Sequence, residues 1–257
     1  MNRDIVRQAG VVIGLVATLT VNALANILPL NGQTSGEISD RFPSRFTPAG
    51  YVFSIWSLIY VGLIAFAVWQ ALPAQRENPL LRRIGWPFVV SCGFNCAWLF
   101  AWHYNQLPIS EILIIGLLVT LIVIYVRIRQ AGPPASNAER WLGRAPFSLY
   151  LGWLTVATVA NTSILLYASG WNGFGVSAET WAVALLVVGL AITAFISWRA
   201  ADPLYALVIV WAYAGIVVKQ QDAQTLAVAA GAGALIAAGL AAWSAWRSGK
   251  LTGPQTA

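Results

Sequence analysis

Indole and amide side chains are the groups in this sequence best suited to binding a small molecule. Trp153, Ala157 and Asn161 follow one another at intervals of four residues, which places them on one face of a helix. Asn95 and Trp98 share a helix face at an interval of three. Ala157 is small enough to leave room for a planar ring beside the indole of Trp153, and an asparagine amide can hold a polar edge. The spacing therefore predicts a site for a flat, apolar ligand.

Each of these side chains also has an ordinary structural use. Asparagine amides hydrogen-bond between helices in a bilayer, where such a bond contributes about 0.6–2 kcal/mol. An indole inside the protein packs in a core as readily as it contacts a ligand, and this applies to Trp56, Trp98, Trp153 and Trp211. The residues alone leave both interpretations open.

The apolar stretches lack the groups that catalysis requires. His, Cys, Asp and Glu do not gather there in a pattern that supports acid–base, nucleophilic or metal chemistry. Cys92 and Cys96 lie four apart on one helix face, which does not favour a disulfide, and are interpreted as small packing side chains. His103 is the single imidazole, and a solvated polar tip is a commoner role for it than ligation of a haem iron. The sequence favours a binding protein over an enzyme and predicts no catalytic residue or metal ligand.

These side chains belong to a chain with the composition of a membrane protein. Of its 257 residues, 58% are hydrophobic and 9% are charged, and its mean hydropathy is +0.69. A typical soluble protein has about 25% charged residues, so a soluble enzyme, a nucleic-acid-binding protein and a disulfide scaffold are excluded. Because a membrane-crossing helix needs about 20 mostly apolar residues, we predict an all-α integral membrane protein. Its eight spans are expected at residues 5–28, 50–70, 86–104, 108–128, 146–168, 179–198, 202–219 and 224–246.

The basic residues predict the orientation of these spans. With the N-terminus inside, 12 of the 15 Lys and Arg residues lie in inner segments, and only Arg41, Arg45 and Lys219 lie in outer ones. This bias indicates that both termini are cytoplasmic, in what we expect to be a bacterial inner (plasma) membrane. Residues 29–49 then form an outer loop, where Arg41 and Arg45 are either solvated or available to acidic groups of a ligand.

Most of the 13 tryptophans have a structural explanation. Indole rings favour the interface between membrane and water, and nine of the tryptophans fall near the ends of predicted spans. These nine are Trp69, Trp86, Trp102, Trp141, Trp171, Trp181, Trp198, Trp243 and Trp246.

Three segments, in this order, resemble the TspO/MBR family of tryptophan-rich sensory proteins, which includes the mitochondrial translocator protein or peripheral benzodiazepine receptor. They are P-A-G-Y-V-F-S-I-W-S-L-I-Y at 48–60, F-N-C-A-W at 94–98 and Y-L-G-W-L-T-V-A-T-V-A-N at 150–161. The family patterns at these places are P-P-x-W-V-F with W-x-x-L-Y, N-x-x-W, and Y-x-x-W-x-x-F-A-x-x-L-N. The chain departs from them at Ala49, Tyr51, Val156 and Ala160.

The resemblance covers roughly residues 1–170 and implies a five-helix bundle with a cavity under the loop between its first two helices. It divides the chain into a bundle at 1–172 and an additional three-helix segment at 173–257. Family members bind porphyrins, haem, sterols and benzodiazepine-type ligands, so a bound porphyrin or haem is expected here, although no cofactor is required. By matching position, the ligand-binding residues would be Tyr51, Phe53, Trp56, Asn95, Trp98, Trp153, Ala157 and Asn161.

Three functions from different classes follow from these patterns. The leading one is a membrane receptor or transporter-like protein that binds a flat lipophilic molecule. The alternatives are a porphyrin-modifying membrane enzyme, and a small-molecule transporter that uses helices six to eight.

The expected partners are a small lipophilic ligand and the lipid bilayer, without nucleic acid. The Gly10-x-x-x-Gly14 spacing fits either a homodimer face or an internal helix contact. The eighth span is rich in Ala and Gly and is expected to dock against the bundle. A monomer is favoured if it covers the dimer face.

Overall fold

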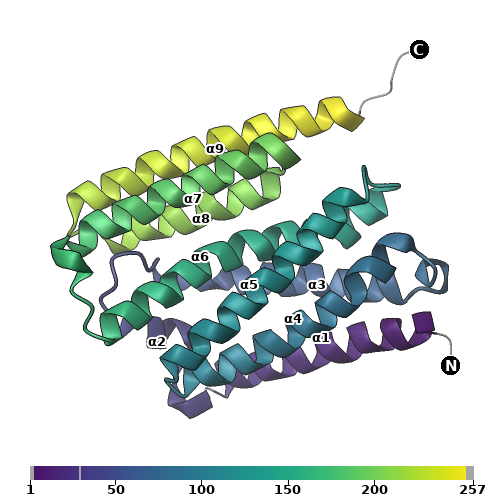
Figure 1. Cartoon of the computed structure of the whole chain (residues 1–257), viewed down its shortest axis with the longest axis horizontal. Coiled ribbons are helices and arrows are strands. Elements are labelled where there is room, and N and C mark those ends of the chain that lie inside the picture. Colours follow the sequence, from purple (N-terminus) through teal and green to yellow (C-terminus); the bar gives the residue numbers. More distant parts are fainter. Residues whose placement is uncertain (1–2, 29, 253–257) are drawn as a thin grey trace.

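The structure is a computed structural model that describes residues 3–28 and 30–252, and this part of the chain is helical without any strand (Figure 1). The α-helices are α1 (Arg3–Ile27), α2 (Ser35–Asp40), α3 (Ile55–Ala71), α4 (Pro79–His103), α5 (Leu107–Gln130), α6 (Ala145–Ala168), α7 (Ala178–Ala200), α8 (Pro203–Lys219) and α9 (Gln224–Thr252). A 3₁₀ segment, η2 (Gly50–Ser54), leads into α3.

Each of the eight predicted spans corresponds to one helix. Seven helical segments of the described part, with η2 and α3 counted as one segment (Gly50–Ala71), are long and apolar enough to cross a membrane. The eighth, α8, has 17 residues, a length of about 25 Å against a hydrocarbon core of about 30 Å. It nevertheless joins the end of α7 to the start of α9 at opposite ends of the bundle (Figure 1). The protein is therefore an all-α integral membrane protein, as predicted.

Helices α1, α3, α4, α5 and α6 form a bundle, and α7, α8 and α9 lie on one side of it (Figure 1). In the bundle, α4 packs against α1 and α5, and α6 packs against α5 and α3. The rings of Phe66, Phe88 and Phe147 meet edge to face where α3, α4 and α6 converge, with centroids 4.9–5.8 Å apart. The additional helices are attached through α8, which packs against α6.

The sequence analysis expects the last helix to dock on the five-helix bundle, but it packs elsewhere. Helix α9 packs mainly against α8 and α7, and α8 lies between α9 and α6. The small residues of α9 do permit close packing, because a Cβ atom on Gly233 would lie 2.9 Å from the ring of Tyr213 on α8. Small residues allow a close approach without specifying the partner, and here the partner is α8.

Helix α4 begins seven residues before the predicted start of its span. Asn78 caps it by accepting hydrogen bonds from the backbone N–H groups of Leu80 and Leu81, and Pro79 occupies the first turn. The apolar pattern starts later because Arg82 and Arg83 interrupt it. Helix formation needs caps and satisfied backbone groups, whereas the apolar window reports only the part that faces lipid.

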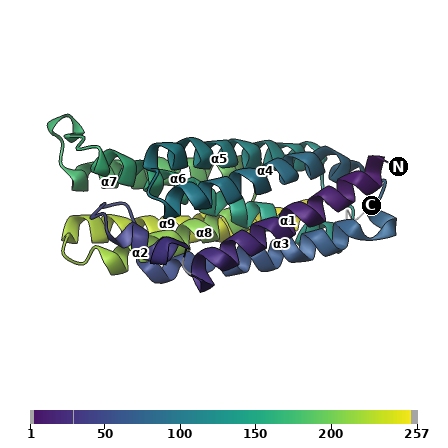
Figure 2. The same cartoon turned by 90° about the horizontal axis from the view of Figure 1, so that it is seen from below.

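The predicted division of basic residues corresponds to the two ends of the bundle. Helix α1 starts and α9 ends at the same end (Figures 1 and 2). Basic side chains near that end join neighbouring elements: Arg127 donates to the carbonyl of Arg83 (2.6 Å) and Arg247 to that of Trp198 (2.6 Å). We call it the arginine-rich end, and the opposite end, with Arg41, Arg45 and Lys219, the loop end. The side chain of Lys250 lies outside the described part.

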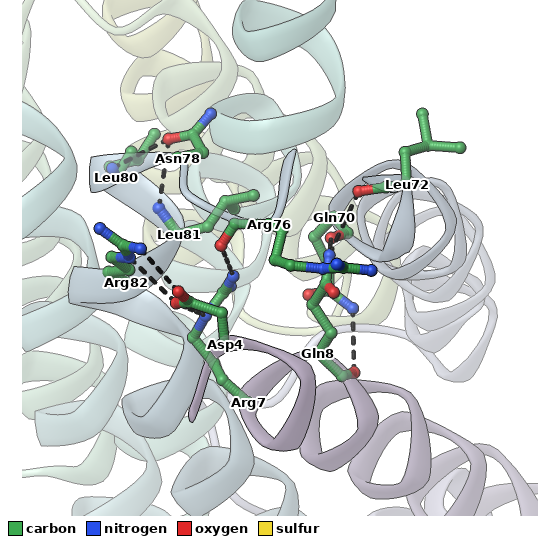
Figure 3. A network of polar contacts seen from close by, with 10 residues as sticks. All are labelled: Asp4, Arg7, Gln8, Gln70, Leu72, Arg76, Asn78, Leu80, Leu81 and Arg82. Carbon is green, nitrogen blue, oxygen red and sulfur yellow. Dashed lines mark hydrogen bonds and ion pairs between the residues drawn. The ribbon is translucent and has the colours of Figure 1, made fainter. Parts of the chain in front are cut away.

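A polar network fixes the start of α1 to the turn between α3 and α4 (Figure 3). Gln8 donates from Nε2 to the carbonyls of Gln70 (2.6 Å) and Leu72 (3.2 Å), and Gln70 donates back to the carbonyl of Gln8 (3.2 Å). Arg82 donates twice to the carboxylate of Asp4, at 2.9 and 2.6 Å. These bonds set the position of α1, which forms one wall of the cavity described below.

Residues 30–49 of the long connection between α1 and η2 are structured. It contains α2, where Thr34 and Glu37 form a capping box. Two ion pairs tie the connection to the turn after α8, Lys219 with Asp40 and Arg45 with Asp222. The connection therefore forms a fixed cover over the loop end of the bundle.

Gly10 and Gly14 lie inside the bundle. A Cβ atom on Gly10 would lie 3.5 Å from Trp86, and one on Gly14 would lie 3.4 Å from Cys92, both on α4. The glycine face of α1 is thus used for packing against α4. Cys92 is buried in this contact and Cys96 is half-buried, and both are free thiols.

Two of the nine tryptophans assigned to the membrane interface are in the core instead. Trp69 is 6% exposed and Trp102 is 3% exposed, whereas Trp86, Trp141, Trp198 and Trp246 are about half exposed, at 49–58%. Trp69 packs over Gly143, where a Cβ atom would lie 2.8 Å from the indole ring. Position near a span end therefore does not decide which face of the helix an indole occupies.

Candidate functional site

Two adjoining hollows lie at the loop end of the five-helix bundle. The larger, which we call the loop cavity, has a volume of about 610 Å³. It lies among α1, α2, η2, α3 and α4, and its lining includes Asn22, Ser35, Phe53, Trp56 and Tyr60. A cavity of 300–1,000 Å³ is typical for a drug-sized ligand. Its position under the 29–49 connection is the one implied by the family resemblance.

The smaller hollow, the aromatic cavity, has a volume of about 30 Å³. A void of this size holds one or two water molecules, at about 10–15 Å³ each. Phe53 and Trp56 line both hollows and separate them. Six of the eight predicted ligand-binding residues line the aromatic cavity: Phe53, Trp56, Trp98, Trp153, Ala157 and Asn161.

Trp56 is the centre of an aromatic cluster that connects three helices. Its ring stacks on Tyr60 with centroids 5.4 Å apart, and it lies 6.1 Å from the ring of Trp98. It also meets Tyr150 and Trp153 edge to face, at 5.7 and 6.2 Å. Edge-to-face and offset rings attract one another beyond simple burial, so Trp56 is held in place as a rigid wall of the loop cavity.

Trp153 contributes a donor without an acceptor. Its side chain is 1% exposed, and its indole N–H has no hydrogen-bond partner among the described residues. Buried polar groups are almost always paired. Because Trp153 lines the aromatic cavity, a water or a ligand acceptor there is the natural partner.

Asn95 ties helices together and does not line either cavity. It is fully buried, accepts a hydrogen bond from Nδ2 of Asn22 (2.9 Å) and donates to the hydroxyl of Tyr150 (2.8 Å). These bonds connect α1, α4 and α6. Asn95 therefore has the structural role that the sequence left open for it, hydrogen bonding between helices within the membrane.

Asn161 is held by three neighbours. Its Oδ1 accepts from the indole N–H of Trp98 (3.2 Å) and the hydroxyl of Ser110 (2.9 Å), and its Nδ2 donates to Oε2 of Glu111 (2.7 Å). The hydroxyl of Thr162 lies 2.6 Å from the other Glu111 oxygen. The amide thus fixes the Trp98 ring at the cavity wall.

Glu111 was not predicted as part of the site, because it lies near the end of its span. A carboxyl group in an otherwise apolar span was the available signal, since such groups are costly and usually functional. The spacing of residues within α5 could not reveal that Glu111 binds Asn161 and Thr162 on α6.

Tyr51 lies away from both cavities. Its side chain is 50% exposed and meets the ring of Trp211 on α8 edge to face, at 5.5 Å. Trp211 also donates from its indole N–H to the carbonyl of Val52 (3.0 Å). This contact gives Trp211 a packing role, one of the two uses that the sequence left open, and it shows that α8 supports η2.

Imidazole, thiolate and thioether groups are absent from the residues that line the loop cavity. The described residues also contain no group of three or more His, Cys, Asp and Glu side chains that could hold a metal. His103 is fully buried, not a solvated tip, with Nδ1 bound to the carbonyl of Leu99 (2.8 Å). It lines neither cavity, so a porphyrin in the loop cavity would be held by rings and polar groups instead of an iron–histidine bond.

Fold and site together define an all-α integral membrane protein with an aromatic-walled cavity beneath a structured loop. The model of the family of TSPO-like proteins matches residues 8–243, so the chain belongs to this family. Proteins of this family are of a membrane ligand-binding or transport type. The match extends well beyond residue 170 and includes α7, α8 and most of α9. Comparison with curated proteins and with solved structures found no match.

Proposed function

We propose that this protein binds a flat lipophilic molecule, a tetrapyrrole or a sterol-like compound, in the loop cavity and without covalent chemistry. The observation that carries the proposal is the combination of a hollow of about 610 Å³ with the rigid ring face of Trp56. A flat indole face held by Tyr60 and Tyr150 is suited to stack on a planar ring.

The polar side chains on the cavity wall support the same ligand class. Asn22, Ser35, Ser54 and Ser57 line an otherwise largely apolar surface. A few polar groups on an apolar wall orient a ligand without requiring that it be polar throughout. Phe53 and Trp56 also separate this cavity from the aromatic cavity.

Titration of the purified protein with protoporphyrin IX, followed by quenching of tryptophan fluorescence, tests the proposal. Replacement Ala23→Phe adds bulk at an exposed position of α1 that lines the loop cavity, so we expect binding to weaken at least tenfold. Trp56→Leu removes the stacking surface and should weaken binding similarly. Trp141→Leu, at a tryptophan that is 58% exposed, serves as the control. Equal affinity in all four proteins would refute the site.

A sterol probe distinguishes the two ligand types. Competition of a sterol against bound protoporphyrin IX, sensitive to Ala23→Phe, would indicate that the cavity accepts both. Binding of only one of them would assign the ligand class.

We also propose that the arginine-rich end faces the cytoplasm of a bacterial inner membrane. The positive-inside rule supports this orientation, because the basic side chains on the loops and helix ends of that side outnumber those on the other.

A further inference from the structure

A third hollow, which we call the α6–α7 pocket, lies apart from the loop cavity and the aromatic cavity. It has a volume of about 450 Å³ and lies between α6, the first turns of α7 and residues 43–46 of the long connection. It exists because α7 packs mainly against α9 and α8 and touches α6 only slightly. The pocket shares no lining residue with the loop cavity or the aromatic cavity.

The walls of this pocket are largely apolar and include two indole rings. Trp171 and Trp181 lie with ring centroids 5.4 Å apart, and Trp181 is fixed by a hydrogen bond from its indole N–H to the carbonyl of Gly173 (3.0 Å). Leu166 and Leu185 line the pocket from α6 and α7. Ser44, Thr162, Ser163 and Asn172 also line it, so the walls are largely but not wholly apolar and suit an apolar body.

One charged side chain, Arg45, is among the lining residues. Its Nη1 donates to Oε1 of Gln220 (3.0 Å) and Oδ2 of Asp222 (2.7 Å), and its side chain is 36% exposed. A guanidinium has five N–H donors, and the hydrogen bonds of Arg45 to described residues use only Nη1. The Nε and Nη2 donors of a positioned guanidinium therefore remain for an acceptor of bidentate shape, such as a carboxylate or phosphate.

We propose that the α6–α7 pocket is a second binding site, for an amphiphile with one anionic head group and an apolar tail. The head group pairs with Arg45, and the tail lies between the indoles of Trp171 and Trp181 and the leucines behind them. The volume is within the range of about 300–1,000 Å³ for small-molecule sites. The head group can be the carboxylate of a free lipophilic acid or the phosphate of a phospholipid, which offer the same chemistry to the guanidinium.

Binding of dansyl-labelled undecanoic acid to the full-length protein in phosphatidylcholine nanodiscs tests the proposal, with energy transfer from tryptophan to dansyl as the signal. The matched probe is the neutral amide of the same compound. We expect the acid to bind at least about tenfold more tightly than the amide, the ratio expected for one charged hydrogen bond. Equal binding of acid and amide would overturn the proposal.

Two variants address the two halves of the site. Arg45→Gln should abolish the preference for the acid, and Arg45→Lys should retain most of it, because the positive charge remains. Ala178→Phe fills the pocket from an exposed position on α7 and should weaken both probes. Unchanged preference in Arg45→Gln, or unchanged affinity in Ala178→Phe, contradicts the site.

The same wild-type and variant proteins also show where the head group comes from and whether the α6–α7 pocket binds independently of the loop cavity. Displacement of the probe in nanodiscs that contain phosphatidylglycerol assigns the site to a phospholipid, and retention of the probe assigns it to a free acid. Because no lining residue is shared, Ala178→Phe should leave protoporphyrin IX binding unchanged, and Ala23→Phe should leave binding of the acid unchanged. Failure of the loop cavity to bind porphyrin would therefore not affect this proposal.

Discussion

Glu111 is the residue on which most of the polar contacts between α5 and α6 depend. Both carboxyl oxygens accept hydrogen bonds, one from Asn161 and one from Thr162. Asn161 in turn accepts from the indole of Trp98, which lines the aromatic cavity. A change at Glu111 therefore reaches the cavity wall through one intervening side chain.

We predict that Glu111→Leu destabilises the protein by about 1–3 kcal/mol, because it leaves an amide donor of the buried Asn161 unpaired. Glu111→Gln should cost much less. Its amide oxygen can accept from Asn161, while its amide nitrogen can donate to Thr162, whose hydroxyl also lies 2.9 Å from the carbonyl of Thr158. Thermal unfolding in detergent measures the stability of both variants.

Glu77→Leu, at an exposed position before α4, is the control for this pair. A loss of stability at Glu77 as large as that at Glu111, or equal losses for Gln and Leu at Glu111, would show that the hydrogen bonds do not matter.

Helix α2 depends on a single carboxylate. Hydrogen bonds from the backbone N–H and the hydroxyl of Thr34 hold the pKa of Glu37 below its ordinary value of 4.5. The lowered pKa means that the ionised form stabilises the folded helix. This contribution is fully present above pH 4.5 and is lost as the pH falls through the lower pKa of the folded state.

We therefore predict that amides of residues 35–40 exchange faster with solvent as the pH falls below about 4.5, after correction for intrinsic exchange. Since α2 roofs the loop cavity through Ser35 and Gly36, ligand release should accelerate over the same range. Glu37→Gln keeps a capping-box side chain but removes the titrating group. Its exchange should not depend on pH in this way, and an identical pH profile would contradict the assignment.

Helix α8 holds the segment η2 by close backbone contact. The backbone N–H of Ala49 donates to the carbonyl of Gly215 (3.1 Å), and a Cβ atom at Gly215 would overlap the side chain of Val52. Only glycine allows this approach. The C-terminal helices therefore support the start of α3, where Phe53 and Trp56 form the cavity wall.

We predict that Gly215→Ala destabilises the protein by about 1–3 kcal/mol through overpacking and weakens protoporphyrin IX binding by displacing η2. Gly239→Ala on α9 is the matched control, because no atom outside the neighbouring backbone of its own helix lies within 4 Å of the added Cβ. It should be neutral or stabilise the helix by about 0.5–1 kcal/mol. Chemical unfolding separates the two outcomes, and equal effects of both changes would refute the role of Gly215.

The sequence predicted the elements of this fold better than their contacts. Spacing placed Trp153, Ala157 and Asn161 on one face of α6, and all three line the aromatic cavity. Spacing within one helix could not reveal that Asn161 binds Glu111 from α5, or that Trp211 binds Val52 from 159 residues away. Tyr51 was assigned by position in a motif, but the packing of α8 turns it away from the cavity.

At the scale of the whole molecule, the C-terminal helices contribute to the walls and supports of both proposed binding sites. Helix α8 supports η2, and α7 forms one wall of the α6–α7 pocket. The sequence analysis divides the chain after residue 172 and so assigns these helices to a separate segment. An ion pair nevertheless connects the two segments, because Arg45 in the long connection is paired with Asp222, which follows α8.

The two ends of the bundle differ enough for orientation to be tested directly. In a protein with Cys92 and Cys96 changed to alanine, single cysteines replace Ala135 at the arginine-rich end or Ser169 at the loop end, both of which are exposed. We predict that a membrane-impermeant maleimide labels Ser169→Cys in spheroplasts and labels Ala135→Cys only after the membrane is permeabilised, because positively charged loops are retained in the cytoplasm. Labelling of both positions in permeabilised cells controls for accessibility. The reverse pattern would place the cover of the loop cavity on the cytoplasmic side, so that its ligand would enter from the cell interior.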